Sequence, residues 1–169
     1  MKKILLPILV LGVVGCSSNQ STSSPQIAKN NFDGSSTVSY KPSNIVCDSL
    51  SLCPNIGFAY NSKSKDYIGV NVVVPSQIKA INELSINIDG NTKTFSAQTT
   101  SDITLLNNYN YSAQTFLVPT DFLAKSKNAR TVTLRIAGPS YIQDGSLRSK
   151  KGEKILAARN LEALLGQIQ

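Results

Sequence analysis

Polar and apolar residues alternate along several short segments of this chain, which is the pattern of half-buried β-strands. Residues 67–74 place apolar, branched side chains at every second position, Ile68, Val70, Val72 and Val74. The alternation recurs over 84–88, and the dipeptide Asp89-Gly90 that follows can adopt the positive φ angles of a tight turn. Residues 92–97 then return as a partner strand. These segments predict a β-hairpin and one further strand.

A third alternating segment places Val132, Leu134 and Ile136 on one face, with Thr133 and Arg135 on the other. Weaker strand patterns cover residues 56–60, 103–106, 115–118 and 141–147. Several short strands separated by turn residues are typical of a sandwich or a barrel. We therefore expect a mainly β fold, either an antiparallel sandwich or an open barrel.

Two helices interrupt the strand pattern. The first is short, begins at Thr120 or Asp121, either of which can cap it, and continues to Lys127. The second begins near Lys154 and carries an apolar stripe at helical spacing. The stripe consists of Ala158, Leu161, Leu164, Leu165 and Ile168. Such a stripe predicts a C-terminal helix packed on the sheet, and we favour that interpretation over a helix that binds a partner.

The composition of the chain changes at about residue 45, where the strand pattern begins. Residues 17–44 are rich in serine and asparagine and contain few large apolar side chains. A segment of this composition cannot bury enough apolar surface to offset its ordering entropy. We therefore expect residues 16–44 to be a flexible tether with a typical reach of about 30 Å. Residues 45–169 then form a single β-rich globular domain.

The first fifteen residues have the layout of a secretory signal peptide. Lys2 and Lys3 form a positive n-region, and residues 4–14 form an apolar segment that is too short to cross a bilayer as a permanent helix. Gly15, a small residue, stands directly before Cys16. Residues 1–15 are therefore predicted to be removed from the mature protein.

The tetrapeptide Val-Val-Gly-Cys at residues 13–16 resembles the lipobox of bacterial lipoprotein precursors. The resemblance implies a diacylglyceryl thioether on Cys16, usually with an N-acyl chain such as palmitate, and two or more chains make a lasting anchor. Ser17 stands where an aspartate would signal retention in the inner membrane. The resemblance thus implies an outer membrane lipoprotein that faces the periplasm or the cell surface. An ordinary signal peptide with a chance cysteine is the alternative.

Cys47 and Cys53 predict a structural disulfide. A secretion signal implies an oxidising compartment, where two cysteines six positions apart form a close pair. A zinc site is the rival interpretation, but the sequence has no histidine and no second cysteine pair. A redox-active pair usually has the spacing Cys-x-x-Cys. We therefore expect neither a metal nor a cofactor.

The residue types that catalysis most often needs are scarce. The chain has no histidine, which excludes Ser-His-Asp and Cys-His arrangements. Two Ser-x-x-Lys matches, at 62–65 and 76–79, are what chance gives in a chain this rich in serine and lysine, and their companion motifs are absent. We expect no catalytic residue and a non-enzymatic domain. The alternative is a hydrolase whose carboxylates meet only in the folded state.

Two segments are candidates for binding. The first is a group of four cations before the last helix, which could hold lipid phosphates or cell-wall carboxylates. It consists of Arg148, Lys150, Lys151 and Lys154. The second is the polar-aromatic stretch 107–112 with Tyr109 and Tyr111, a composition used to recognise sugars and proteins. The simpler interpretations are a solvated loop for the cations and a plain hairpin connection for the tyrosines.

The formal net charge of +7 falls by two when Lys2 and Lys3 leave with the signal peptide. This modest excess suits lipid phosphates or other envelope anions, and export argues against nucleic acid as a partner. The sequence favours an outer-membrane-anchored lipoprotein whose non-enzymatic β-rich domain binds or scaffolds a protein, lipid or cell-wall component of the envelope. A surface-displayed adhesin or host-factor binder is the alternative. The sequence leaves the oligomeric state open.

Overall fold

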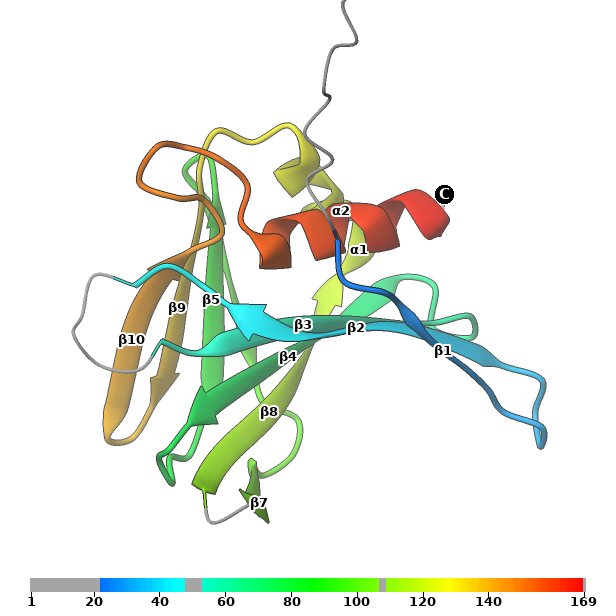
Figure 1. Cartoon of the computed structure of the whole chain (residues 1–169), viewed down its shortest axis with the longest axis horizontal. Coiled ribbons are helices and arrows are strands. Elements are labelled where there is room, and N and C mark those ends of the chain that lie inside the picture. Colours follow the sequence, from blue (N-terminus) through cyan, green and yellow to red (C-terminus); the bar gives the residue numbers. More distant parts are fainter. Residues whose placement is uncertain (1–21, 48–52, 107–108, 169) are drawn as a thin grey trace, which may run out of the picture.

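A computed structural model describes residues 22–47, 53–106 and 109–168, with the main chain alone over 104–106 and at 109. Within these residues, ten strands form two antiparallel sheets in the orders β1-β2-β3-β4-β8-β7 and β10-β9-β5-β6. Figure 1 shows the larger sheet curled beneath the C-terminal helix, with the smaller sheet running across one end of it. The predicted mainly β fold with two helical segments is confirmed.

The larger sheet contains β1 (Gln26–Lys29), β2 (Ser36–Asn44), β3 (Asn55–Asn61), β4 (Tyr67–Pro75), β7 (Asp102–Leu106) and β8 (Tyr109–Pro119). The smaller sheet contains β5 (Glu83–Ile88), β6 (Asn91–Ser96), β9 (Val132–Gly138) and β10 (Tyr141–Ser146). The helical segments are α1 (Thr120–Ala124), the 3₁₀ turn η1 (Lys125–Lys127) and α2 (Leu156–Gln167). A main-chain bridge between Val46 and Ser146 joins the two sheets.

The predicted hairpin turn joins β5 to β6. Asp89 and Gly90 have φ angles of 48° and 90°, and the side chain of Asn87 accepts a hydrogen bond of 2.9 Å from the main-chain N–H of Gly90. Glycine adopts such angles without strain, and aspartate tolerates them better than most residues. The turn therefore fixes the register in which β5 and β6 pair.

The core lies between the two sheets and beneath α2. The alternating apolar residues of β4 and of the β5–β9 pair are buried and face the interior, with Phe116 and Phe122 between them. Helix α2 packs on β2 and β3 and buries Leu161, Leu164 and Leu165. The predicted docking of the C-terminal helix on the sheet is thus confirmed, and the helix begins two residues later than the sequence indicated.

The tether prediction is wrong over residues 26–44, because most of this segment belongs to β1 and β2. Tyr40 is buried, and its hydroxyl accepts a hydrogen bond of 3.1 Å from Gln167 at the end of α2. The main-chain N–H of Ser23 donates to the side-chain oxygen of Asn160 at 3.0 Å, so the chain already contacts α2 at Ser23. The signal peptide and Cys16 lie outside the described residues.

The start of α1 also differs from the prediction. Pro119 occupies the N-cap position, Thr120 is the first helical residue, and no side chain caps the helix. The carboxylate of Asp121 accepts a hydrogen bond of 2.7 Å from the N–H of Phe122. Proline lacks an N–H, and the long strand β8 runs directly into the helix, so β8 rather than a capping side chain sets the start of α1.

Candidate functional site

The outer face of the four-stranded sheet carries two rows of polar side chains, which we call the polar rows. Strand register aligns each row across β6, β5, β9 and β10. The first row is Thr94, Ser85, Arg135 and Asp144, and the second is Thr92, Asn87, Thr133 and Ser146. The alternate residues of the same strands, such as Ile86 and Leu134, point into the core. The same alternation that builds the core therefore builds a continuous polar surface.

The polar rows line a groove of about 610 Å³. Its walls also include Val46, which precedes the disulfide, and Lys150, in the loop between β10 and α2. The groove is open to solvent, since Thr92, Thr133 and Arg135 are exposed. A site of this size accommodates a small molecule or one unit of a longer polymer.

Arg135 and Asp144 form a two-pronged ion pair in the first row. Arg135 donates from Nε and from one terminal nitrogen to the two carboxylate oxygens, at 2.7 and 2.8 Å. The hydrogen bonds with Arg135 lower the pKa of Asp144, and the same contacts raise the pKa of Arg135. Both side chains are more than half exposed, and the pair uses only two of the five N–H groups of the guanidinium.

Neutral side chains of the polar rows bond to one another across β5 and β6. The hydroxyl groups of Ser85 and Thr94 lie 2.8 Å apart, and the amide nitrogen of Asn87 donates to the hydroxyl of Thr92 at 2.6 Å. These cross-strand bonds fix the rotamers of the four side chains. Hydroxyl and amide groups each have more than one hydrogen-bonding position, so they can still bind a polar ligand.

The predicted group of four cations is divided by the fold. Arg148 is only 7% exposed, and its guanidinium donates to the carbonyl oxygens of Ser126 and Ala129 at 3.3 and 2.7 Å. Lys154 pairs with Glu162 of α2 and donates to the carbonyl of Lys127 at 3.1 Å. Arg148 lines the groove and Lys154 does not, but both side chains already have partners within the domain, so ligand binding by these two residues stays a prediction.

Lys150 and Lys151 lie at the exposed tip of the loop between β10 and α2. The hydroxyl of Ser149 accepts hydrogen bonds from the main-chain N–H groups of Lys151 and Glu153, and Gly152 closes the turn with a φ angle of 81°. The loop is thus ordered by its own main chain. Of the two lysines, Lys150 lines the groove and Lys151 does not.

The predicted polar-aromatic loop is in part a strand. Tyr109 and Tyr111 belong to β8, where Tyr111 pairs with Thr104 of β7 and Pro75 of β4. Residues 107–108 and the side chain of Tyr109 lie outside the described structure. Tyr111 belongs to the larger sheet and does not line the groove, so the fold does not bring the tyrosines and the lysines into one site.

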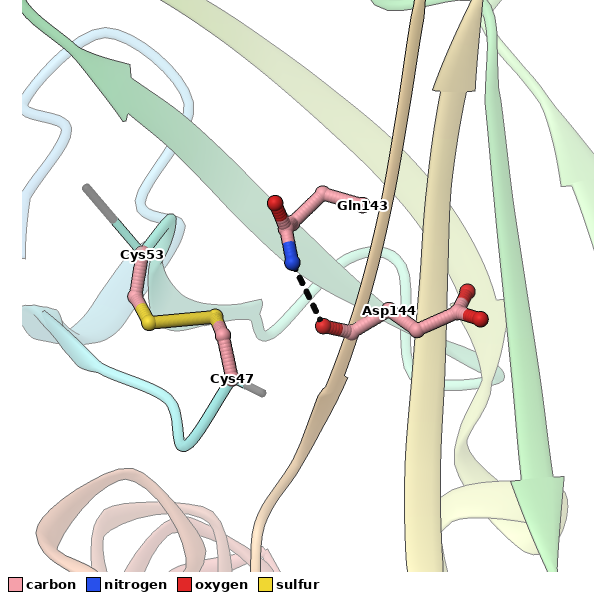
Figure 2. The surroundings of a disulfide bond; sticks show 4 residues. All are labelled: Cys47, Cys53, Gln143 and Asp144. Carbon is pink, nitrogen blue, oxygen red and sulfur yellow. Dashed lines mark hydrogen bonds between the residues drawn. A yellow bond between two sulfur atoms is a disulfide. The ribbon is translucent and has the colours of Figure 1, made fainter. Parts of the chain in front are cut away.

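The predicted disulfide between Cys47 and Cys53 is present, with the two Cα atoms 5.8 Å apart. Figure 2 shows the Gln143 side chain pointing from β10 toward the disulfide, while the Asp144 carboxylate points to the opposite side of the strand. The amide nitrogen of Gln143 donates to the main-chain oxygen of Asp144 at 2.9 Å (Figure 2). The disulfide and the Asp144 carboxylate therefore lie on opposite sides of β10.

Two negative findings apply to the described part of the chain. Over residues 22–47, 53–106 and 109–168, no three histidine, cysteine, aspartate or glutamate side chains gather in a way that could hold a metal ion. In the same ranges, neither helix has the length and apolar character needed to cross a membrane.

Comparison of the whole chain with protein-family models, with curated proteins and with solved structures gives no match. The site is therefore interpreted from its own geometry.

Most residues of the groove were not identified as site residues from the sequence. Their signal is the polar half of each alternating segment, visible at Thr133 and Arg135, which the sequence shows opposite the apolar half of β9. The contribution of β5, β6 and β10 depends on the strand order β10-β9-β5-β6. In that order β9 pairs with β5, which lies more than forty residues earlier in the chain. That order is set by tertiary pairing and leaves no local pattern.

Proposed function

We propose that this chain is an outer membrane lipoprotein, acylated at Cys16, whose β-rich domain binds an envelope sugar chain bearing carboxylate or phosphate groups. The groove over the four-stranded sheet is the binding surface. The lipobox-like residues 13–16 supply the case for the anchor, and the groove supplies the case for the ligand.

The observation that carries the ligand proposal is the alignment of the two polar rows across four strands. None of the side chains in these rows is aliphatic or aromatic, so each of them offers a ligand polar contacts. Hydroxyl and amide groups at regular strand spacing match the closely spaced hydroxyl groups of a sugar chain.

The charges of the groove favour an anionic sugar chain over a neutral one. Asp144 is neutralised by Arg135, whose remaining N–H groups are available to a second anion. Lys150 adds an exposed ammonium group from the adjoining loop. Guanidinium and ammonium groups together bind carboxylates and phosphates through charge-assisted hydrogen bonds.

The ligand proposal is tested by blocking the groove with one bulky side chain. Thr133→Trp fills the centre of the second polar row, and Thr115→Trp is the matched control, an exposed strand threonine on the larger sheet. Co-sedimentation with purified cell-wall sacculi reports binding to a carboxylate-bearing glycan. Flotation with vesicles that contain a phosphorylated glycolipid, with both variants made in the unacylated Cys16→Ser chain, reports binding to the phosphate source.

We expect Thr133→Trp to lose retention on one of these two materials, and Thr115→Trp to be retained like the unmodified chain. The material that Thr133→Trp no longer binds shows whether the groove recognises a carboxylate or a phosphate. Equal retention of both variants on both materials would contradict the proposed binding surface.

The anchor is tested separately. Cys16→Ser removes the only sulfur that can accept the diacylglyceryl group at the predicted cleavage site. We expect the variant to lose metabolic labelling with a fatty acid and to leave the membrane fraction. A Cys16→Ser chain that still carries the label would refute acylation at this residue.

A further inference from the structure

The hairpin formed by β1 and β2 presents a solvent-exposed aromatic side chain at its tip. Phe32 is 98% exposed, and Ile27 on the adjoining strand is 67% exposed. Figure 1 shows this hairpin extending beyond the rest of the domain. Single exposed apolar side chains are common on proteins, but Phe32 stands at the tip of a projecting hairpin, with exposed Ile27 on the adjoining strand.

The tip, residues 30–35, is held in one conformation by its own hydrogen bonds. The side chain of Asn30 accepts from the N–H of Phe32 at 2.9 Å, and its main-chain oxygen accepts from the N–H of Gly34 at 2.9 Å. The carboxylate of Asp33 accepts from the N–H of Ser35 at 2.9 Å, and Gly34 adopts a φ angle of 72°. Phe32 is therefore held outward by an ordered turn.

Two lysines adjoin the tip of the hairpin. Lys29 ends β1 directly before the tip and is exposed. Lys63, from the turn between β3 and β4, lies 3.0 Å from the carboxylate of Asp33, and its side chain remains 58% exposed. An aromatic ring flanked by lysines is the composition of a segment that enters the polar boundary of a lipid bilayer.

The position of Ser23 limits how far the domain can stand from an acylated Cys16. Because Ser23 is bonded to Asn160 of α2, the free chain between lipid and domain is short. Seven residue steps span at most about 25 Å when fully extended. The hairpin begins at Gln26, three residues beyond Ser23, so few residues separate it from the acylated end of the chain.

We propose that the β1–β2 hairpin inserts Phe32 into the interfacial region of the membrane that holds the lipid anchor, with Lys29 and Lys63 at the phosphate level. The inference rests on the proposed acylation of Cys16. The hairpin then acts as a second, weaker contact that fixes how the domain is oriented on the membrane. One acylated point would leave the domain free to rotate, whereas two contacts restrict it.

The sequence contains no tryptophan, so a single tryptophan reports on one chosen site. The full acylated chain carrying Phe32→Trp is reconstituted into phospholipid vesicles, some of which contain lipids with a quenching nitroxide near the headgroup. Ile142→Trp is the matched control, since Ile142 is 70% exposed on β10 of the other sheet. Neither substitution removes a buried side chain, so both variants keep the fold.

We expect vesicles to shift the emission of Phe32→Trp to shorter wavelength, and the nitroxide lipids to quench it. The emission of Ile142→Trp should keep its position and remain open to a water-soluble quencher. Water-exposed emission of Phe32→Trp on a chain that carries its acyl groups, verified by intact mass, would overturn the insertion and leave the anchor standing. Absence of acyl groups on Cys16 would overturn both proposals.

Discussion

The guanidinium of Arg148 donates a hydrogen bond of 2.7 Å to the carbonyl oxygen of Ala129, in the loop that follows η1. The same group donates to the carbonyl of Ser126 at 3.3 Å. Arg148, one of the four cations that the sequence groups before α2, thus holds η1 and the loop after it against the loop after β10.

Arg148→Ala should therefore destabilise the domain. The change leaves two buried carbonyl oxygens without their donor, and one hydrogen bond to a charged group contributes about 1.5–3 kcal/mol, so we expect a loss of at least that size. Urea denaturation measures this free energy of unfolding. A variant with unchanged stability and reduced ligand binding would show that Arg148 serves the ligand instead.

Leu161→Ala tests whether α2 belongs to the core. Leu161 is 1% exposed in the face of α2 that packs on β2 and β3. Removing its side chain leaves a cavity, so the free energy of unfolding should fall by about 2–5 kcal/mol. Lys151→Ala, at an exposed loop position, is the control and should leave the melting temperature unchanged. Equal melting temperatures for the two variants would show that α2 is not part of the core.

Loss of the disulfide should weaken the domain without unfolding it. The loop closed by Cys47 and Cys53 is short, because the cysteines are only six positions apart. Replacing both with serine should therefore lower the free energy of unfolding by only about 2 kcal/mol. Alkylation before and after reduction checks the bond itself. Quantitative labelling of both thiols in unreduced protein would contradict the assignment.

Asp89 should make the stability of the domain depend on pH in the acid range. Its carboxylate accepts hydrogen bonds from the N–H groups of Thr131 at 2.7 Å and Arg130 at 3.1 Å. These bonds, that from Thr131 foremost, lower the pKa of Asp89 below its ordinary value of 3.8. The folded state therefore binds the proton less tightly than the unfolded state does. The contribution of Asp89 to stability is complete above pH 3.8 and is lost as the pH falls through the lowered pKa.

Asp89→Asn removes this titrating group and keeps a side chain that tolerates the positive φ angle. We expect the melting temperature of the variant to fall less steeply with pH below 3.8 than that of the unmodified chain. Some dependence should remain, because Asp33 and Asp144 also have lowered pKa values. Identical pH profiles would show that Asp89 does not contribute.

The strands of the core could be predicted because apolar and polar residues alternate within each of them, as in β4 and β9. β1 and β2 could not, because the few large apolar residues of this serine-rich segment, Tyr40 among them, do not alternate regularly. The burial of Tyr40 depends on α2, more than one hundred residues later, which supplies both the covering surface and the bond from Gln167. Composition alone therefore made an ordered segment resemble a tether.

The candidate site was harder to predict than the fold for a related reason. The sequence shows that Arg148 and Lys150 are two residues apart, but their side chains serve different purposes. Both residues line the groove, but the Arg148 guanidinium is held by the carbonyl groups of Ser126 and Ala129, whereas the Lys150 side chain is exposed. Which cation is buried depends on the acceptors that the fold places beside it, and these come from elsewhere in the chain.

Two neighbouring lysines test most directly whether the groove over the four-stranded sheet is the binding surface. Lys150 lines the groove, and Lys151 is equally exposed and does not. The measurement is the affinity of the Lys150→Ala and Lys151→Ala chains for the anionic glycan that Thr133→Trp fails to bind. We expect Lys150→Ala to bind about tenfold more weakly, as the loss of one charge-assisted contact predicts, and Lys151→Ala to bind like the unmodified chain. Equal affinities of the two variants would contradict the account.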